Sequence, residues 1–166
     1  MTKRFCSCLL IYLLAFICTS GFANESETAK TVQITKADNL AADSRLSKDG
    51  PSVIILYIAA PDCPFCKKLE REVLIPFIKS GDYKNKAILR KINWHSSESI
   101  IDFNGEESTP INILKSYDLK ITPTLLFLDS EGNEVYERSI GYSGNEFFWY
   151  YLDVAITKSN LAIANH

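Results

Sequence analysis

The sequence lacks an excess of basic residues and contains little methionine or histidine. Its 166 residues hold 18 Lys+Arg against 20 Asp+Glu, which gives a formal net charge of −2. Proteins that neutralise nucleic-acid phosphates need a surplus of Lys and Arg, so this balance argues against a nucleic-acid partner. Disorder is excluded too, because 46% of the residues are hydrophobic and the net charge is small. The length fits one ordinary globular domain.

Residues 1–23 differ from the rest of the chain and have the pattern of a secretory signal peptide. Lys3 and Arg4 form a positively charged start, and an uncharged, mainly apolar stretch follows them. Gly21 and Ala23 supply the small residues of a cleavage site. The densest apolar run is about half as long as the roughly 20 residues of a spanning helix. We therefore favour a cleaved signal over an uncleaved membrane anchor.

Cleavage after Ala23 would leave 143 residues and remove three of the five cysteines. The mature chain then contains a single cysteine pair, Cys63 and Cys66, with C-x-x-C spacing. Export from a bacterium would place this pair in the periplasm, where disulfides persist. Residues 24–35 are polar and are interpreted as a leader, and residues 36–166 are the predicted domain.

The order of predicted elements along the domain indicates an α/β fold. The apolar run at residues 52–60 is typical of a strand buried on both faces. A helix is expected from Cys63 onward, with a kink or stop near Ile75 because proline follows. The other expected elements are helices at 36–48 and 109–117 and strands at 87–92, 125–129 and 134–138. The first half is then a parallel βαβ unit and the second contains an antiparallel hairpin.

A final helix is expected after residue 146. Ser143 and Glu146 have the spacing of a capping box that would open this helix. Helical spacing places six residues on its buried face: Phe147, Phe148, Tyr151, Leu152, Ala155 and Ile156.

The C-x-x-C pair, Cys63 and Cys66, is the candidate site of thiol–disulfide chemistry. Cys63 follows a buried strand and stands at the start of a helix, where free backbone N–H groups and the helix dipole stabilise a thiolate. The thiolate is the attacking species in disulfide exchange. Cys66 lies one helical turn further, within reach of Cys63, and should be more buried. Cys63 is therefore the predicted nucleophile and Cys66 the predicted resolving thiol.

Two other interpretations of the pair are weaker. A permanent disulfide would close such a small loop that it removes little entropy from the unfolded chain. A structural zinc site needs four ligands, and the chain has only His95 and His166 as histidines. A Cu(I) metallochaperone would use the two thiols as soft ligands. Met1, the only methionine, lies in the signal segment. We expect redox chemistry and no metal.

These features together resemble the thioredoxin superfamily over about residues 36–158. The resemblance rests on the strand before Cys63-Pro64-Phe65-Cys66, on Ile121-Thr122-Pro123-Thr124 and the strand behind it, and on Gly141 before the last helix. It implies a thioredoxin-like fold, a central mixed sheet of about four to five strands flanked by helices. In that family the proline is cis and packs beside the active disulfide, and the preceding residue presents backbone groups to the substrate peptide. Carried over, these substrate-binding roles fall on Pro123 and Thr122.

The chain also departs from the family pattern. Thioredoxins place a buried acid six residues before the nucleophile, and this chain has Tyr57 there. Pro64 and Phe65 lie between the cysteines, so they are the candidate residues that tune the motif. Residues 94–108 exceed the usual connection and are expected to form a polar loop. A cover over the active site or a partner-binding segment is one interpretation of this loop, and ordinary anchors with solubilising charges are the favoured one.

The predicted function is thiol–disulfide exchange with protein substrates in the periplasm, with reduction favoured over disulfide-forming oxidation. The redox-active disulfide between Cys63 and Cys66 is the only cofactor expected. Because no quinone or NAD site is visible, electrons must come from a partner protein, which the resemblance implies is a membrane thiol carrier. No helical dimerisation domain is present, so we expect a monomer.

Overall fold

The computed structural model describes residues 31–50, 52–144 and 146–165, and the predicted signal peptide lies outside them. Its centre is strand β1, Val53–Ala59, in which all seven residues are buried. Apolar side chains on both faces of one strand require a layer of helices on each side. β1 pairs in parallel with β2, Ala87–Asn93, and antiparallel with β5, Thr124–Leu128. The sequence prediction of a doubly buried central strand is confirmed.

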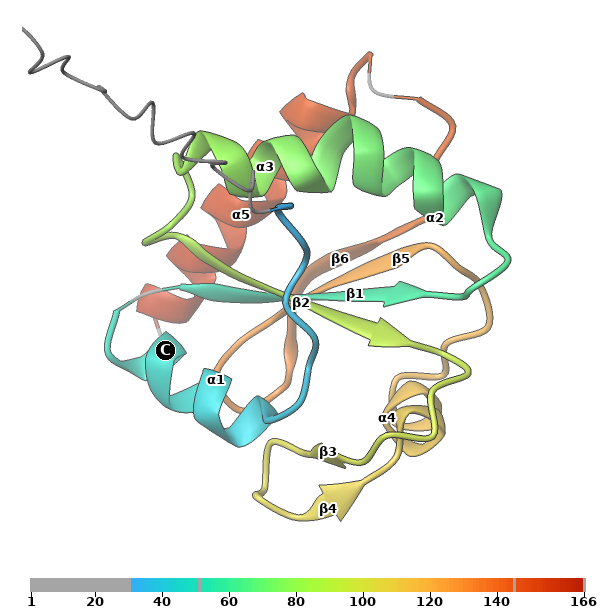
Figure 1. The fold of residues 1–166 in the computed structure, drawn as a ribbon. Coiled ribbons are helices and arrows are strands. Elements are labelled where there is room, and N and C mark those ends of the chain that lie inside the picture. The colour runs from blue at the N-terminus through green and yellow to red at the C-terminus, as the bar shows by residue number, and fades with distance from the viewer. Residues whose placement is uncertain (1–30, 51, 145, 166) are drawn as a thin grey trace, which may run out of the picture. The chain divides into compact units, whose positions relative to one another are not determined.

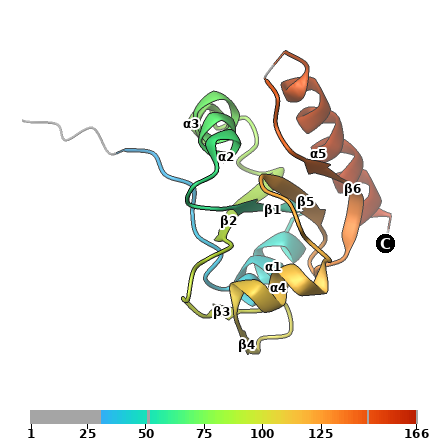
Figure 2. The ribbon, with the colours of Figure 1, turned by 90° about the vertical axis from the view of Figure 1, so that its right-hand side faces the viewer.

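The main sheet has the strand order β2-β1-β5-β6, with β6 spanning Glu134–Ile140 and antiparallel to β5. One face is covered by α2, Pro64–Leu69, α3, Ile75–Ser80, and α5, Phe148–Ala164 (Figures 1 and 2). The other face is covered by α1, Leu40–Lys48, and α4, Pro110–Ser116. The parallel βαβ unit and the antiparallel hairpin are both present. The predicted α/β class with a mixed central sheet is therefore confirmed, with four strands.

Two separate apolar cores form on the two faces of this sheet. Alternate residues of β1 divide between them, because successive side chains of a strand point to opposite faces. Ile55 and Tyr57 belong to the core under α2 and α5, and Ile54 and Leu56 to the core under α1 and α4. Both cysteines of the pair belong to the first core.

The helix after Cys63 continues through Pro76 without stopping. It consists of α2, Pro64–Leu69, a π-helical turn, Glu70–Leu74, and α3, Ile75–Ser80. Proline lacks the N–H of a regular turn, and its ring clashes with the carbonyl four residues earlier. A π-turn widens the backbone locally and removes this conflict. The expected kink or stop near Ile75 is thus a π-turn that ends at Leu74.

Helix α1 is shorter than predicted and spans Leu40–Lys48. Asn39 adopts an extended backbone and caps the helix by accepting a 2.8 Å hydrogen bond from the backbone N–H of Ala42. The residues before it bridge to the sheet instead, with Lys36 opposite Lys91 of β2. The expected helix start at residue 36 is therefore wrong, because main-chain pairing with β2 takes these residues.

We expect Asn39→Ala to lower the free energy of unfolding by about 1 kcal/mol, since it removes the side chain that caps α1. Asn39→Ser should retain most of the stability, because a serine hydroxyl caps equally well. Urea unfolding of the three proteins measures this difference. Equal midpoints for the alanine and serine variants would contradict the capping role.

The expected loop at residues 94–108 contains a small hairpin. Its strands are β3, Ile100–Ile101, and β4, Glu107–Ser108, followed by α4, Pro110–Ser116, with Thr109 as its cap. Ile100 is buried, and Phe103 packs against the core under α1 and α4. Gly132, with a φ of +86°, lies so close to Phe103 that an added Cβ would meet its ring at 2.6 Å. The segment is thus an anchored part of the domain.

Helix α5 begins differently from its prediction. It starts at Phe148, and its first residues have no side-chain cap, so the expected Ser143–Glu146 capping box is wrong. Phe147 and Tyr151 are 63% and 64% exposed, whereas Trp149 packs against the first core. Phe148 also packs against this core, and the predicted burial of Leu152, Ala155 and Ile156 is confirmed, with Ser159 buried beside them. Residues 147–151 are all aromatic, so helical periodicity could not indicate which of them face the core.

Candidate active site

The cysteine pair lies where β1 ends and α2 begins. β1 ends at Ala59, whose carbonyl accepts a 2.8 Å hydrogen bond from the backbone N–H of Trp94 in the loop after β2. Cys63 is the N-cap of α2, with an extended backbone, and Pro64 takes the first helical turn. Proline fits there because its missing N–H has no partner in the first turn of a helix. The sequence therefore places Cys63 at a helix N-terminus, as predicted.

Cys63 and Cys66 form a disulfide, with Cα atoms 5.2 Å apart. The backbone N–H of Cys66 also donates to the Cys63 Sγ at 3.0 Å. Cys66 is 1% exposed and Cys63 is 8% exposed, so the second cysteine is the more buried, as expected. Phe65, between them, is 57% exposed. A donor N–H and the helix N-terminus both favour the thiolate form of Cys63 once the disulfide opens.

The Thr122–Pro123 pair lies at the same end of the sheet. Its peptide bond is cis. Thr124 opposes Ile58 in the register of β5 and β1, so Pro123 continues β5 beside the end of β1 that leads to Cys63 (Figure 1). The Pro123 carbonyl accepts a 2.8 Å hydrogen bond from the backbone N–H of Gly141. Pro123 is buried and Thr122 is half-buried. All six predicted site residues thus belong to one end of the domain.

A polar network that the sequence analysis did not predict lies beside Cys66, whose carbonyl oxygen is 3.3 Å from the Tyr57 hydroxyl. The Tyr57 hydroxyl donates to the Glu70 carboxylate at 2.9 Å, and Lys91 pairs with the same carboxylate oxygen at 2.7 Å. Burial, and then the Glu70 carboxylate, raise the pKa of Tyr57, so its hydroxyl stays neutral and donates a proton in this network. Nothing in the local sequence pattern connects these three positions, because they come from β1, the π-turn and β2.

A second tyrosine–glutamate pair holds the other side of the same helix. The Tyr142 hydroxyl donates to Glu72 at 3.0 Å, and Lys68 donates to the Ser143 carbonyl at 3.0 Å. Burial, and then the hydrogen bond to Glu72, raise the pKa of Tyr142 to about 12. These contacts fix the start of the helix against the loop before α5.

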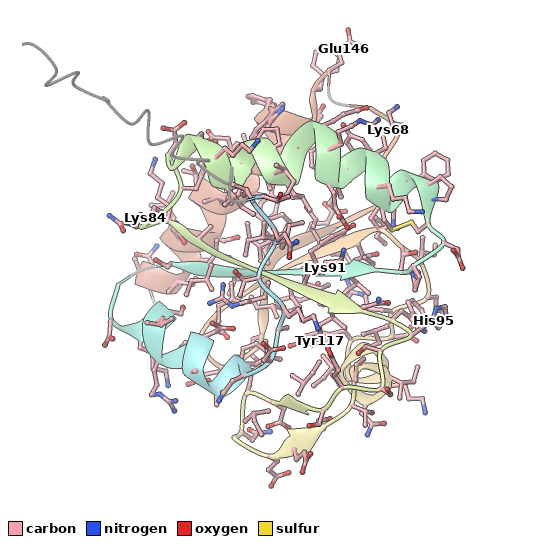
Figure 3. All side chains as sticks on the ribbon, in the orientation of Figure 1. Lys68, Lys84, Lys91, His95, Tyr117 and Glu146 are labelled. Atoms are coloured by element: carbon pink, nitrogen blue, oxygen red, sulfur yellow. A yellow bond between two sulfur atoms is a disulfide. The ribbon has the colours of Figure 1, made fainter. Side chains whose placement is uncertain are left out.

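A cavity of about 730 Å³ opens beside this network. Glu70 and Lys91 line it together with Lys36, Glu98 and His95. His95 follows β2 and is exposed (Figure 3). Lys36 and Glu98 form an exposed ion pair at 2.7 Å.

Within residues 31–50, 52–144 and 146–165, no three His, Cys, Asp or Glu side chains gather as a metal-ligand group. No helix of the same residues is long and apolar enough to cross a membrane.

Comparison with known proteins identifies the family. The model of the thioredoxin-like domain family matches residues 41–156, and the chain belongs to this family. With the Cys63–Cys66 disulfide, this makes the chain a thioredoxin-like thiol–disulfide oxidoreductase. The predicted resemblance is thereby confirmed. No curated protein sequence matches the chain significantly.

Solved structures share the fold at low sequence identity. The solution structure of a thioredoxin from Thermus thermophilus has a TM-score of 0.56 at 17% identity and covers 76% of this chain and 91% of its own. Two others score lower: the periplasmic thioredoxin SoxS from Paracoccus pantotrophus and the C-terminal domain of DsbD from Neisseria meningitidis. SoxS has a TM-score of 0.45 at 19% identity and covers 65% of this chain and 99% of its own. The DsbD domain has a TM-score of 0.49 at 19% identity and covers 69% of this chain and 90% of its own.

Proposed function

We propose that this protein reduces disulfides of protein substrates in the periplasm, with Cys63 as the nucleophile and Cys66 as the resolving thiol. The observation that supports this most directly is the position of the Cys63–Cys66 pair. Cys63 caps a helix and accepts a hydrogen bond from the Cys66 N–H, and Cys66 is almost completely buried. A substrate therefore meets the Cys63 sulfur before that of Cys66.

The reaction has two exchange steps. The Cys63 thiolate attacks one sulfur of a substrate disulfide, which forms a mixed disulfide and releases one substrate thiolate. The Cys66 thiol then loses its proton and attacks the Cys63 sulfur, which forms the Cys63–Cys66 disulfide and releases the second substrate thiolate. Two electrons pass from the protein to the substrate, and the two released thiolates each take one proton. No cofactor beyond this disulfide is needed.

The substrate chain is proposed to lie against Thr122 and Pro123, next to Phe65. Thr122 precedes β5 at the sheet end where the disulfide lies, and an extended peptide there could pair with its backbone. Phe65 projects an exposed apolar ring beside Cys63, which suits apolar side chains that flank a substrate cysteine. Pro64 fixes the first turn of α2 and, with Phe65, would influence the redox potential of the pair.

Export and the electron source complete the proposal. Residues 1–23 have the charge and apolar pattern of a signal peptide, which supports a periplasmic location. A chain that reduces substrates ends each cycle as a disulfide, so a donor must return two electrons to it. We propose that this donor is a membrane protein with a thiol pair, and that the chain acts on it as a monomer.

Insulin reduction with dithiothreitol as the electron source tests this function. We expect the purified, exported protein to accelerate insulin reduction well above the uncatalysed rate, since a helix-capping thiolate exchanges faster than an ordinary thiol. A parallel titration with Cu(I) tests the metallochaperone alternative. Stoichiometric Cu(I) binding without any acceleration of insulin reduction would contradict the proposal.

A further inference from the structure

Glu70 lies one helical turn beyond Cys66 on the same side of the helix. Its backbone N–H donates to the Cys66 carbonyl, which is the regular bond between residues four apart. Side chains on a helix lean toward its N-terminus, so the Glu70 side chain covers the turn that holds Cys66. The carboxylate is therefore held near the buried cysteine, at a position that the sequence analysis passed over.

Tyr57 connects the carboxylate to Cys66. The Tyr57 side chain is fully buried, and its hydroxyl lies 2.9 Å from Glu70 Oε1 and 3.3 Å from the Cys66 carbonyl oxygen. Cys66 and Tyr57 also belong to the same buried cluster, the core under α2 and α5. Burial also keeps the phenol protonated, as the raised pKa of Tyr57 indicates. A neutral hydroxyl can accept one proton while it donates another.

Lys91 holds the carboxylate from the other side. Its Nζ lies 2.7 Å from Glu70 Oε1 and 5.8 Å from the centre of the Tyr57 ring. The Lys91 and Glu70 side chains are 30% and 27% exposed, so both reach the cavity of about 730 Å³. The same cavity carries charged or titratable groups from the neighbouring segments: Lys36, Asp38, His95 and Glu98. A proton that reaches Glu70 therefore has an open route to solvent.

We propose that Glu70 accepts the proton of the Cys66 thiol when Cys66 attacks the mixed disulfide, with Tyr57 and Lys91 as positioning residues. The Cys66 proton passes to the Tyr57 oxygen as the Tyr57 proton passes to Glu70. The resulting Cys66 thiolate attacks the Cys63 sulfur, the bond from Cys63 to the substrate breaks, and the substrate leaves as a thiolate. Glu70 then loses its proton to water in the cavity. This inference rests on the proposed function, because it concerns the second of its two steps.

Ellman's reagent separates the two steps in one experiment. Each reduced protein releases a first thionitrobenzoate when Cys63 attacks and a second when Cys66 resolves the mixed disulfide. For Glu70→Gln we expect the second phase to slow by about 10²-fold at neutral pH, as for the loss of a general base. The first phase should stay within about twofold of the wild-type rate. The wild-type second phase should slow as the pH falls, as expected for a step that needs a base, and the variant should lose this dependence.

Glu72→Gln is the matched control. Glu72 lies on the same π-turn and also accepts a hydrogen bond from a tyrosine, but that tyrosine is Tyr142 on the loop before α5. Its second phase should keep the wild-type rate and pH profile. Tyr57→Phe, which keeps the ring and removes the hydroxyl, should slow the second phase while the first is unchanged. If Glu70→Gln does not fold, the second-phase rate of Tyr57→Phe tests the proposal in its place.

The outcomes separate the two proposals. A wild-type protein that releases no second thionitrobenzoate and does not reduce insulin would overturn the proposed function itself. An active wild type, together with Glu70→Gln and Tyr57→Phe variants that keep its second-phase rate and pH profile, would overturn only the role of Glu70. Glu70→Asp should recover part of the rate if a carboxylate is what the step requires.

Discussion

Cys66→Ser is expected to accumulate a covalent adduct with substrate, and Cys63→Ser is expected to form none. Both variants should reduce insulin only at the background rate. The reason lies in the helix start: Cys63 caps α2 and receives the Cys66 N–H, whereas the Cys66 side chain is 1% exposed. Without Cys66 the mixed disulfide at Cys63 has no resolving thiol. Non-reducing electrophoresis of each variant after incubation with oxidised insulin measures the adduct.

The double variant with serine at both positions is the control, and it should form no adduct. The adduct of Cys66→Ser should disappear on addition of dithiothreitol, which identifies it as a disulfide. An adduct that forms with Cys63→Ser and fails to form with Cys66→Ser would reverse the two roles. Equal adducts with both variants would mean that burial and helix position do not distinguish the cysteines.

Asp43→Ala is expected to lower the free energy of unfolding by about 3 kcal/mol, because it leaves Arg90 without its partner. Asp43 of α1 accepts two hydrogen bonds from the Arg90 guanidinium of β2, at 3.0 and 2.6 Å. The exposed fraction of the side chain is 5% for Asp43 and 20% for Arg90. The partial exposure of Arg90 places the expected loss at the lower end of the range for buried pairs. Urea unfolding of the oxidised protein measures it.

The pair should nevertheless be replaceable by apolar side chains. Burial raises the pKa of Asp43 even though the Arg90 guanidinium opposes this shift, so desolvation of the carboxylate outweighs its pairing. An Asp43→Leu, Arg90→Met double variant should therefore be as stable as the wild type within about 1 kcal/mol, or more stable. Because folding raises this pKa, acidification to about pH 4 removes no stability through Asp43. A double variant that is less stable than Asp43→Ala would contradict this explanation.

The parts of the fold that the sequence predicted are those with strong local signals. β1 is a continuous apolar run, and the proline at the start of α4 and the turn before β6 mark their positions by residue type alone. Cys63 and Cys66 could be placed at a strand–helix junction for the same reason. The outward face of Tyr151 and the main-chain pairing before Asn39 depend on neighbours that are distant in sequence, so local periodicity misassigned them.

The candidate site divides in the same way. The cysteines and Thr122–Pro123 belong to short motifs, which can be recognised from the order of residues alone. Glu70 is one of several charged residues on a helix, and only the meeting of β1, the π-turn and β2 gives it Tyr57 and Lys91 as partners. Its spacing of four residues after Cys66 was the one available signal, because that spacing places two side chains on one face of a helix.

The reduction potential of the Cys63–Cys66 pair tests the central claim most directly. The oxidised and reduced proteins would be equilibrated in glutathione and dithiothreitol buffers, and the fraction of disulfide measured by thiol alkylation and mass spectrometry. A reductase of protein disulfides requires a strongly reducing pair, and we predict a potential of about −270 mV. A potential of about −120 mV would identify an oxidant and contradict the account.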